Sequence, residues 1–414
     1  MPSTPWLGVI ADDYTGATDL AGMIARRGMR VVQYLGIPDQ PVEDVDCVVV
    51  ALKSRSTPAA DAVDESVGAA KWLLETGVEQ LYFKYCSTFD STDEGNIGPV
   101  ADALAELVDA RAVVFCPATP EHGRTTYSGH HFVGDTLLSE SPLRDHPINP
   151  MRDPDLRRVL SRQTATAVSS LPLPVVQADD ASDALKEFGA RTFVIADAVT
   201  DADVAAVARA TRQAPLVTGG AALASELAAL RAVEQSTPAP LEIPNGPAVV
   251  LAGSCSAATR RQLARLGEDH PAFKIDAYAL DRGDDVVGEA LRFIEANRDQ
   301  LPVVAASSDP DAVRQVQEDL GLGRSARLIE DALGAIARGA ADAGFTRILV
   351  AGGESSGAVV NGLGVRALRI GREVAPGVPW TVAVGEEPVG LLLKSGNFGG
   401  ESVFADALAM ADER

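Results

Sequence analysis

Two glycine-rich segments near the C-terminus follow short apolar stretches, and such an arrangement could bind phosphate. The first continues from the apolar run 347–351 into Gly-Gly-Glu-Ser-Ser-Gly at 352–357, and the second reads Lys-Ser-Gly-Asn-Phe-Gly-Gly from 394 to 400. A strand that breaks into small residues before a helix leaves backbone N–H groups free for an anion. Lys394 would add a point charge there. We therefore expect a nucleotide site in the C-terminal part of the chain.

Neither segment matches a standard nucleotide-binding pattern. Gly352 and Gly357 have the spacing of a Walker A loop, but Ala358 stands where that loop has its lysine, and no Gly-x-Gly-x-x-Gly follows a strand here. The glycines could instead only form tight strand-to-helix turns. Two such loops in one region favour the binding interpretation.

Two adjacent acids, Asp12 and Asp13, follow the first apolar run at 7–11. Ligands of open α/β sheets bind beyond the C-terminal ends of strands, so these side chains are candidates for catalysis. Helix capping would explain one of the two acids. The second could accept a hydrogen bond from a substrate hydroxyl and act as a base. The segment alone leaves both interpretations open.

Cations and hydroxyl groups follow the next strand-like runs. Arg55 lies in the segment Lys-Ser-Arg-Ser at 53–56, and Lys84 begins a polar run that reaches Asp90 and Ser91. Arginine binds carboxylates in a bidentate manner, so these groups could hold a small hydroxylated acid. The alternatives are a solvated loop and a capped turn. Arg124, in a later polar segment, is another candidate contact for an anion.

The 414-residue chain carries a formal net charge of −22. A surface this acidic repels nucleic acid and anionic membranes, so we expect neither as a partner. An anionic ligand must then be held by local cations or by a bound metal. No apolar run reaches the length of a membrane span, and the first residues lack a signal-type apolar core, so we expect a cytoplasmic protein. The scattered cysteines indicate reduced thiols, and the histidines show no metal-ligand spacing.

Apolar strands alternate with helical patterns along both parts of the chain. In the first part we expect strands at 7–11, 30–35, 47–52, 80–85, 112–116, 191–196 and 214–217, with helices at 17–27 and 59–75. The second part repeats this alternation at 248–252, 302–306 and 346–351. The pattern predicts an α/β protein with two doubly wound α/β domains and a cleft between them. Residues 117–150 show little periodicity, as in a functional or disordered loop.

A proline-rich stretch at 235–247 indicates a linker between the two parts. We place the boundary near residue 240. The predicted domains are 1–238, which would bind a four-carbon acid sugar, and 246–414, which would bind a nucleotide. A cleft between two such domains could close on its ligands and exclude water during phosphoryl transfer.

Four motifs, in this order, resemble those of the four-carbon acid sugar kinases. They are Asp-Asp-x-Thr-Gly-Ala at 12–17, Lys-x-x-Ser-Thr-x-Asp-Ser-Thr at 84–92, Gly-Gly-Glu-Ser-Ser-Gly at 352–357 and Lys-Ser-Gly-Asn-Phe-Gly at 394–399. The likeness covers nearly the whole chain. It implies a sugar-acid-binding domain followed by a nucleotide-binding domain. It also implies an ATP-dependent kinase that phosphorylates the terminal hydroxyl of a four-carbon sugar acid.

The resemblance also implies roles for individual residues. Asp12 is the expected base, with Asp13 as the alternative, and the sugar acid would be held by both together with Arg55, Lys84, Asp90, Ser91 and Arg124. ATP would be held by Ser254, Gly352, Gly353, Glu354, Ser355, Ser356, Gly357, Lys394, Gly396 and Gly399. Mg²⁺ would bridge the phosphates, as in other phosphoryl transfers, but its protein ligands are unknown. Ser355 stands where the family often has threonine, and it keeps the hydroxyl.

The segments 86–98 and 116–127, with Gly-His-His-Phe-Val at 129–133, resemble most closely the family members that act on a 3-oxo-tetronate. D-threonate and D-erythronate are the alternative acceptors. A sugar-acid sensor without catalysis is a further alternative, and a dehydrogenase is disfavoured by the missing dinucleotide fingerprint. The sequence leaves the oligomeric state open, with a homodimer among the alternatives.

Overall fold

A computed structural model describes residues 4–41, 43–146, 149–178, 180–232, 241–267, 270–306 and 310–413. The chain divides into two compact units, Met1–Ala239 and Pro240–Arg414, and each is described by itself. In the predicted linker, residues 235–240 lie outside the described residues. The rest of that linker, 241–247, contains neither helix nor strand.

The first unit is built on a parallel sheet. Its strands are β1 Leu7–Ala11, β2 Val31–Leu35, β3 Cys47–Ala51, β4 Gln80–Lys84, β5 Ala112–Cys116, β9 Ala167–Leu171, β10 Thr192–Ala196 and β11 Leu216–Gly219. They lie in the order β2-β3-β1-β4-β11-β5-β10-β9, and each neighbouring pair is parallel. The central strands are apolar on both faces, as parallel strands covered by helices must be.

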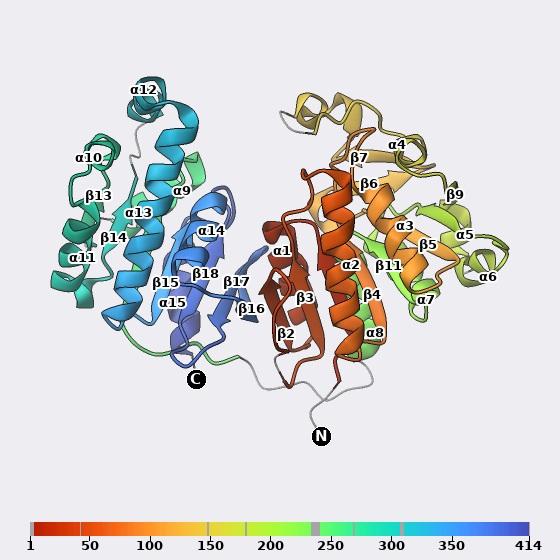
Figure 1. Ribbon diagram of the computed structural model, residues 1–414, viewed down its shortest axis with the longest axis horizontal. Helices are drawn as coiled ribbons and strands as arrows, with labels where there is room; N and C mark the ends of the chain where they lie inside the picture. Colours follow the sequence, from red (N-terminus) through yellow and green to blue (C-terminus); the bar gives the residue numbers. More distant parts are fainter. Residues whose placement is uncertain are drawn as a thin grey trace. The chain divides into compact units, whose positions relative to one another are not determined.

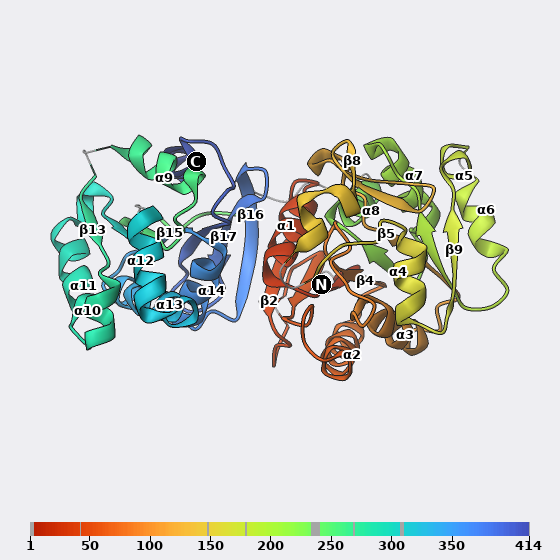
Figure 2. The ribbon, with the colours of Figure 1, turned by 90° about the horizontal axis from the view of Figure 1, so that it is seen from above.

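Helices cover both faces of this sheet (Figure 1). They are α1 Tyr14–Ala25, α2 Ala59–Glu75, α3 Ile97–Leu107, α4 Leu156–Gln163, α5 Leu173–Gln177, α6 Ala181–Lys186, α7 Asp201–Thr211 and α8 Ala221–Ala232. Helices α1, α7 and α8 pack side by side on one face, and α2, α3 and α4 lie on the other (Figure 2). Helix α1 begins three residues earlier than expected because Asp13 caps it.

The segment 117–150, expected to lack regular structure, contains a small antiparallel sheet. Its strands are β6 Arg124–Tyr127, β7 His130–Val133 and β8 Thr136–Leu137. The turn between β6 and β7 places Ser128 and Gly129 at φ 49° and 71°, as a tight hairpin requires. These strands are short and rich in His and Thr, so they carry no apolar alternation that sequence inspection would detect.

The second unit contains a mixed sheet. Its strands are β12 Ala248–Ala252, β13 Ala272–Lys274, β14 Val303–Ala305, β15 Arg347–Ala351, β16 Ala367–Ala375, β17 Val378–Ala383 and β18 Gly390–Lys394. They lie in the order β13-β14-β12-β15-β18-β17-β16. The five neighbouring strands β13, β14, β12, β15 and β18 pair in parallel, whereas β17 pairs antiparallel with both β18 and β16. This antiparallel edge was not expected from the sequence.

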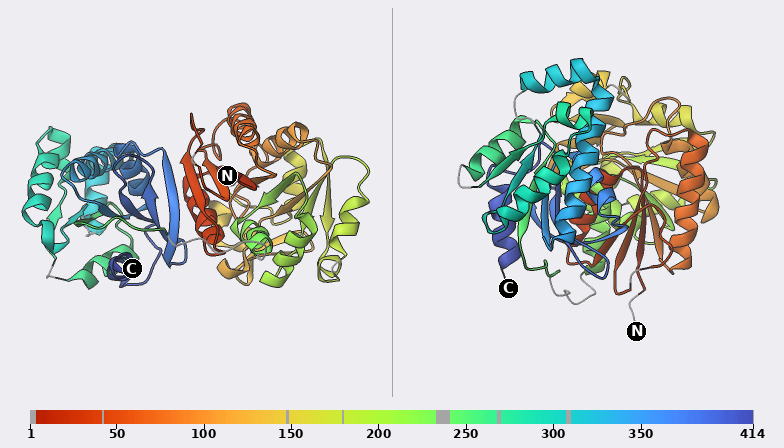
Figure 3. Two further views of the ribbon diagram at one scale, coloured as in Figure 1. Left: turned by 90° about the horizontal axis from the view of Figure 1, so that it is seen from below. Right: turned by 60° about the vertical axis from the view of Figure 1, so that its left-hand side comes forward.

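Helices also cover both faces of the second sheet. They are α9 Ala257–Leu266, α10 Ala277–Arg282, α11 Val286–Ala296, α12 Pro310–Leu320, α13 Leu322–Asp342, α14 Gly353–Gly362 and α15 Val403–Asp412. Helices α11, α13 and α14 pack on one face, and α9 and α15 on the other (Figure 3). The buried indole of Trp380 on β17 donates a hydrogen bond to the Ala407 carbonyl of α15, at 2.9 Å. This bond fastens the C-terminal helix to the sheet.

Each sheet has one point at which the direction of strand addition reverses. In the first unit the chain leaves β1 for the β2 side and leaves β4 for the β5 side, so the reversal lies between β1 and β4. In the second unit the corresponding pair is β12 and β15. The loops that follow such strands diverge and leave a crevice, where open α/β sheets bind ligands. Asp12 and Asp13 follow β1, and Asp90 follows β4, whereas Arg55 follows β3. Ser254 and the segment 352–357 follow β12 and β15, whereas Gly396 follows β18.

Candidate active site

Asp12, Asp13 and Arg55 form one hydrogen-bonded cluster at the reversal point of the first sheet. Because Ala11 lies beside both Ala51 and Lys84 in the sheet, the segments after these strands begin at one level. Arg55 donates to Asp12 through Nε (2.9 Å, to Oδ2) and Nη2 (2.7 Å, to Oδ1). The same Nη2 donates to Oδ1 of Asp13, at 2.7 Å. One guanidinium therefore holds both acids in place.

The two aspartates differ in the hydrogen bonds that their carboxylate oxygens accept and in their exposure to solvent. Both oxygens of Asp12 are occupied by Arg55, and its side chain is only 7% exposed. In Asp13, Oδ1 accepts from Arg55 and from the Gly16 N–H, at 3.1 Å. Within the described part of the chain, no hydrogen bond reaches Oδ2 of Asp13, whose side chain is 27% exposed. Asp13 is thus both the helix cap and the more accessible carboxylate.

Lys84 ends β4 beside this cluster. It is buried, and its Nζ donates to the Tyr85 carbonyl at 2.7 Å. A Cβ atom at Gly16 would come within 2.9 Å of this Nζ and within 2.4 Å of Asp13 Oδ1. Glycine at position 16 therefore lets the lysine approach the start of α1.

Burial raises the pKa of the Asp12 carboxyl, and the Arg55 guanidinium opposes that shift. Asp19, on the next turn of α1, is half-buried, and the desolvation of its carboxyl raises its pKa, with Lys84 and His122 acting against that shift. The sequence analysis did not single out Asp19. Asp19 lies three residues after Gly16, on the same face of the helix, and this spacing could have predicted its place near the cluster.

A buried amide holds the loop that carries Arg55. The Asn96 side chain donates to the carbonyls of Ser54 (2.6 Å) and Thr57 (2.9 Å), from a position just before α3. Its only sequence signal was its place in a polar run. Asn96 fixes the backbone on either side of Arg55 and so helps to aim the guanidinium at the two aspartates.

The other predicted sugar-acid residues lie apart from this direct cluster. Asp90 accepts from Thr88 Oγ1 at 2.5 Å, and its charge acts on the Cys86 thiol together with those of Arg55 and Lys84. Arg124 lies on β6, where its Nη1 donates to the His122 carbonyl at 2.9 Å.

Ser91 is turned toward α4. Its hydroxyl accepts from Gln163 Nε2 at 2.8 Å, and it lines a separate cavity with Arg162. Asp90 is thus linked to the Asp–Arg cluster through the Cys86 thiol, whereas neither Arg124 nor Ser91 has such a link among the described contacts.

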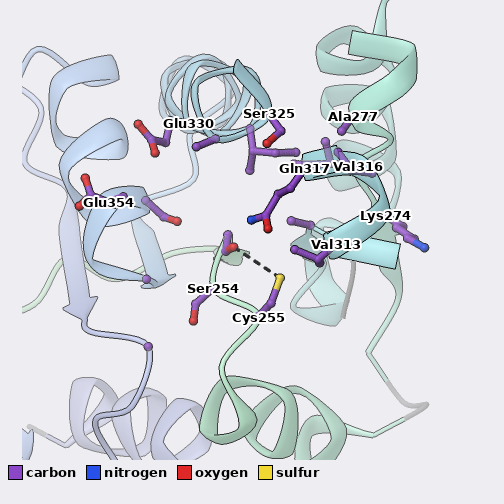
Figure 4. A pocket seen from close by; sticks show the side chains of 18 of the residues that line it. Ser254, Cys255, Lys274, Ala277, Val313, Val316, Gln317, Ser325, Glu330 and Glu354 are labelled. Carbon is purple, nitrogen blue, oxygen red and sulfur yellow. Dashed lines mark hydrogen bonds between the residues drawn. The ribbon is translucent and has the colours of Figure 1, made fainter. Parts of the chain in front are cut away.

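The second unit contains a cavity of about 740 Å³ at its own reversal point. Its floor is formed by the ends of β12 and β15, which Ala252 and Ala351 bring to the same level. Its wall is mostly apolar and comes from the segment 275–278, α12 and α13. Val313 and Val316 on α12 are among its apolar side chains, and Ser325 and Glu330 on α13 are polar exceptions (Figure 4). A cavity of this size and character suits a nucleoside.

Three loops meet at the floor of this cavity. A Cβ atom at Gly253 would lie 2.2 Å from Ser355 Oγ, and one at Gly396 would lie 2.3 Å from Ser254 Oγ. Gly352 has φ 131° and is the residue before α14. Small residues are therefore required by close packing of the three loops, and the first residues of α14 line the cavity beside them.

Helix α9 anchors the loop 395–400 through three polar side chains. Ser256 Oγ and Thr259 Oγ1 donate to the Gly396 carbonyl, at 2.6 and 2.9 Å. Gln262 Nε2 donates to the carbonyls of Phe398 and Gly399, both at 3.0 Å. The sequence analysis did not identify these anchors. The sequence pattern that could have predicted them is a polar residue at every third position on one face of the helix, where apolar residues are expected.

The predicted ATP residues divide into two groups. Those that line the cavity are Ser254, Gly352, Gly353, Glu354, Ser355 and Gly396. Those outside its lining are Ser356, Gly357, Lys394 and Gly399. In the second group, Ser356 Oγ bonds back to the Gly352 carbonyl at 2.7 Å, and the Gly399 carbonyl is held by Gln262. These residues shape the loops and do not face the cavity.

Lys394 is 1% exposed, and its Nζ lies 3.4 Å from the Gly396 carbonyl oxygen. Burial lowers the pKa of this lysine to about 8. The charge of Lys394 therefore lies just behind the glycine loop, where an anion in the cavity would favour its protonated form.

Two family models cover most of the chain. One is described as a sugar-binding N-terminal domain and matches residues 7–227, and the other is described as a nucleotide-binding C-terminal domain and matches 249–404. A 3-oxo-tetronate kinase of Burkholderia multivorans is 47% identical over 422 residues, covering 99% of this chain and 98% of the relative. The chain belongs to the four-carbon acid sugar kinase family. The resemblance found in the sequence is confirmed.

Other members of the four-carbon acid sugar kinase family agree with this assignment. A 3-oxo-tetronate kinase of Cupriavidus necator is 48% identical, covering 98% of this chain and 96% of the relative. The crystal structure of Haemophilus influenzae protein HI1011 superposes with a TM-score of 0.90 at 39% identity, over 98% of this chain and 100% of that one. In the described residues, no helix combines the length and apolar character needed to cross a bilayer.

Proposed function

We propose that this protein is an ATP-dependent kinase that transfers the γ-phosphoryl group to the 4-hydroxyl of 3-oxo-tetronate. The observation that carries the proposal is the similarity, over nearly the full length, to kinases named for that acceptor. The geometry supports it, because each unit presents a group of polar or glycine residues at its reversal point. The proposed domains are 1–238 for the sugar acid and 246–414 for the nucleotide.

ATP would enter the cavity of the second unit with its adenosine against the apolar wall. Its phosphates would lie over Gly353, where a Cβ atom would meet nothing within 4 Å, with Gly352 and Gly396 beside it in the cavity lining. The N–H groups that begin α14 and the Ser254 and Ser355 hydroxyls would donate to phosphate oxygens. Lys394 would contribute its charge from behind the loop.

Mg²⁺ fits this site as a metal carried by the nucleotide. Among the described residues, no group of three His, Cys, Asp or Glu side chains is arranged to hold a metal ion by itself. Magnesium usually binds through one or two carboxylates together with phosphates and water. Glu354, at the first turn of α14, and Glu330 line the cavity and provide such carboxylates. When bound, the metal would neutralise charge that develops on the phosphates.

The sugar acid would bind beside the Asp–Arg cluster of the first unit. Lys84, Arg55 and Arg124 supply cations for its carboxylate, and Asp90 supplies an acceptor for its hydroxyl groups. We propose Asp13 as the base rather than Asp12, because Asp13 keeps one free and accessible oxygen while Arg55 occupies both oxygens of Asp12. Asp12 then acts by holding Arg55.

Phosphoryl transfer needs the 4-hydroxyl and the γ-phosphate to meet in line. Turnover therefore requires the ligands of the two units to come together. The cleft expected between the domains stays a prediction, as do the homodimer and the cytoplasmic location.

The test is release of ADP from Mg-ATP in the presence of 3-oxo-tetronate, D-threonate, L-threonate or D-erythronate. We expect the highest kcat/KM with 3-oxo-tetronate. A preference for a threonate or D-erythronate would replace the acceptor and keep the kinase. Binding of a sugar acid with no ADP release from any of the four would contradict catalysis and favour the sensor.

A further inference from the structure

One buried imidazole in the first unit has no role in the proposed function. His131, on β7, is fully buried, and its Nδ1 lies 3.0 Å from Thr126 Oγ1. Its other ring nitrogen, Nε2, is buried without a hydrogen-bond partner within the described part of the chain. Buried polar atoms nearly always have a hydrogen-bond partner, so a buried ring nitrogen without one needs an explanation.

The small sheet places His131 on the same face as Arg124. In the β6–β7 register Thr126 lies opposite His131, and Arg124 lies opposite Val133. Because side chains alternate along a strand, Arg124, Thr126 and His131 share one face, and Tyr127 and His130 lie on the other. Thr126 and His131 are buried, whereas Tyr127 is 52% exposed. The face that carries Arg124 is therefore the inner face.

The hairpin is fastened at several points and can serve as a rigid support. The Asp197 carboxylate accepts from the N–H groups of Ser128 (2.8 Å) and Gly129 (2.9 Å) at its turn. The Thr126 N–H donates to the Ala198 carbonyl, and the His131 N–H donates to the Pro154 carbonyl, both at 2.9 Å. These bonds tie both strands to the first unit.

The inner face lies against the turn that follows β4. The charges on Arg124 and Asp90 and the backbone of Ser87 all act on the His131 ring. Since Nδ1 is engaged by Thr126, Nε2 is the nitrogen left to face Ser87. Burial lowers the pKa of His131 to about 3, so the ring is neutral at working pH.

This turn has an unusual backbone. The Phe89 N–H donates to the Cys86 carbonyl at 2.9 Å, and Phe89 has φ 55°, in the left-handed region that disfavours residues with a side chain. Its buried ring packs edge-on against Tyr85, with centroids 5.2 Å apart. Such a conformation persists only where the surroundings hold it. A second support for the turn is therefore to be expected beside Ser87.

We infer that His131 is a positioning residue for the acceptor site, in which Nε2–H holds the Ser87–Asp90 turn against the hairpin that carries Arg124. The inference rests on the proposed function for the identity of the acceptor. It requires Thr126 to donate to Nδ1, which leaves the proton on Nε2. Asp90 and Arg124 then keep fixed positions on either side of the sugar acid.

Two conservative variants separate the two ring nitrogens. His131→Gln places an amide nitrogen near the position of Nε2 and loses the Thr126 contact, whereas His131→Asn reaches only the Nδ1 position. We expect His131→Asn to raise KM for the sugar acid by about tenfold or more. Its KM for ATP should be unchanged, and its kcat should stay within about twofold of the wild type. His131→Gln should resemble the wild type, as should the control His130→Gln on the outer face.

A measurement without substrate keeps the inference independent of the kinase assignment. In hydrogen exchange of the full chain, peptides covering 84–92 should exchange faster in His131→Asn than in His131→Gln, while 59–75 is unchanged. Equal exchange of the 84–92 peptides in both variants would overturn the inference. Faster exchange in His131→Gln than in His131→Asn would overturn it as well. If neither variant folds, ¹⁵N spectra of the labelled wild type decide, because protonation at Nδ1 instead of Nε2 contradicts the proposed bond.

Discussion

Asp12 and Asp13 are adjacent in the chain, yet their surroundings give them different capacities. One is locked on both oxygens by Arg55, and the other caps α1 with a single oxygen. A base must reach a substrate proton, so accessibility separates the two. The contacts of the two carboxylates therefore favour Asp13 for proton removal and Asp12 for holding Arg55 in position.

Asp13→Asn should lower kcat by about 10²- to 10⁴-fold, the usual contribution of a general base. Stability should change little because asparagine caps a helix as well as aspartate does. Asp12→Asn should instead lower the free energy of unfolding by about 1.5–3 kcal/mol, because the half-buried Arg55 guanidinium loses a charged partner. Turnover kinetics and thermal unfolding of both variants test this. Unchanged kcat in Asp13→Asn would remove Asp13 as the base.

Lys394 should make ATP binding depend on pH. Its lowered pKa of about 8 means that the free protein loses this charge as pH rises through that value, whereas bound phosphate favours the ammonium form. ATP affinity should therefore fall above pH 8. Calorimetric titrations across pH 7–9.5 test this, with Lys394→Arg as the variant whose charge persists and whose affinity stays level.

Lys394 should also make the free energy of unfolding depend on pH. The native state favours the neutral amine, while the unfolded chain keeps its proton up to the ordinary lysine value. Between these values the unfolded state binds more protons, so the free energy of unfolding rises with pH. This contribution should disappear in Lys394→Met, and a wild-type trend of opposite sign would contradict the burial argument.

Among the secondary-structure elements, the start of α14 combines a closely packed glycine with an open one. Gly352 takes a positive φ and packs against Ser355, whereas a Cβ at Gly353 meets no atom within 4 Å. The space over Gly353 belongs to the cavity, and the fold does not need that position empty. The structure thus offers a position where a side chain should block a ligand without disturbing the protein.

Gly353→Val should weaken ATP binding by at least about tenfold with little change in unfolding temperature. Gly357→Ala is the matched control, since Gly357 lies on the same helix, also has open space around it and does not line the cavity. That control should keep ATP affinity and gain about 0.5–1 kcal/mol of stability from the helical alanine. Normal ATP affinity in a folded Gly353→Val protein would remove this loop from the nucleotide site.

At the scale of the whole molecule, the chain divides into two compact units, each with its own sheet and helical layers. A ligand that binds one folded unit stabilises that unit by mass action. If the proposed domains bind the ligands assigned to them, nucleotide and sugar acid should act on different parts of the chain.

Hydrogen exchange with each ligand alone measures this directly. Mg-ADP should slow exchange in peptides from the segment 246–414, and the sugar acid should slow exchange in peptides from 1–238. Each ligand at about 100 times its Kd should add about 2.7 kcal/mol to the unit that it binds. Protection by Mg-ADP confined to the first unit would reverse the assignment of domains.

The α/β class, most of the parallel strands and the motifs that identify the family could be predicted from the order of residues alone. These features are local, because apolar runs, helical periodicity and glycine-rich strand ends leave patterns within a few residues of one another. Helix α2 was predicted with the bounds that the structure has. The short strands of 117–150 were not predicted because they carry no apolar alternation, and the antiparallel pairing of β17 with β16 and β18 was not expected either.

What each site residue can do depends on how the folded chain packs around it. Arg55 lies more than forty positions from the aspartates that it binds, and the walls of the cavity come from helices that carry no nucleotide motif. The difference between Asp12 and Asp13 and the buried position of Lys394 depend on such distant contacts. So does the His131 nitrogen that has no hydrogen-bond partner among the residues that the structure describes. Hydrogen-bond partners and burial are properties of packed neighbours, and the order of residues along one chain does not specify them.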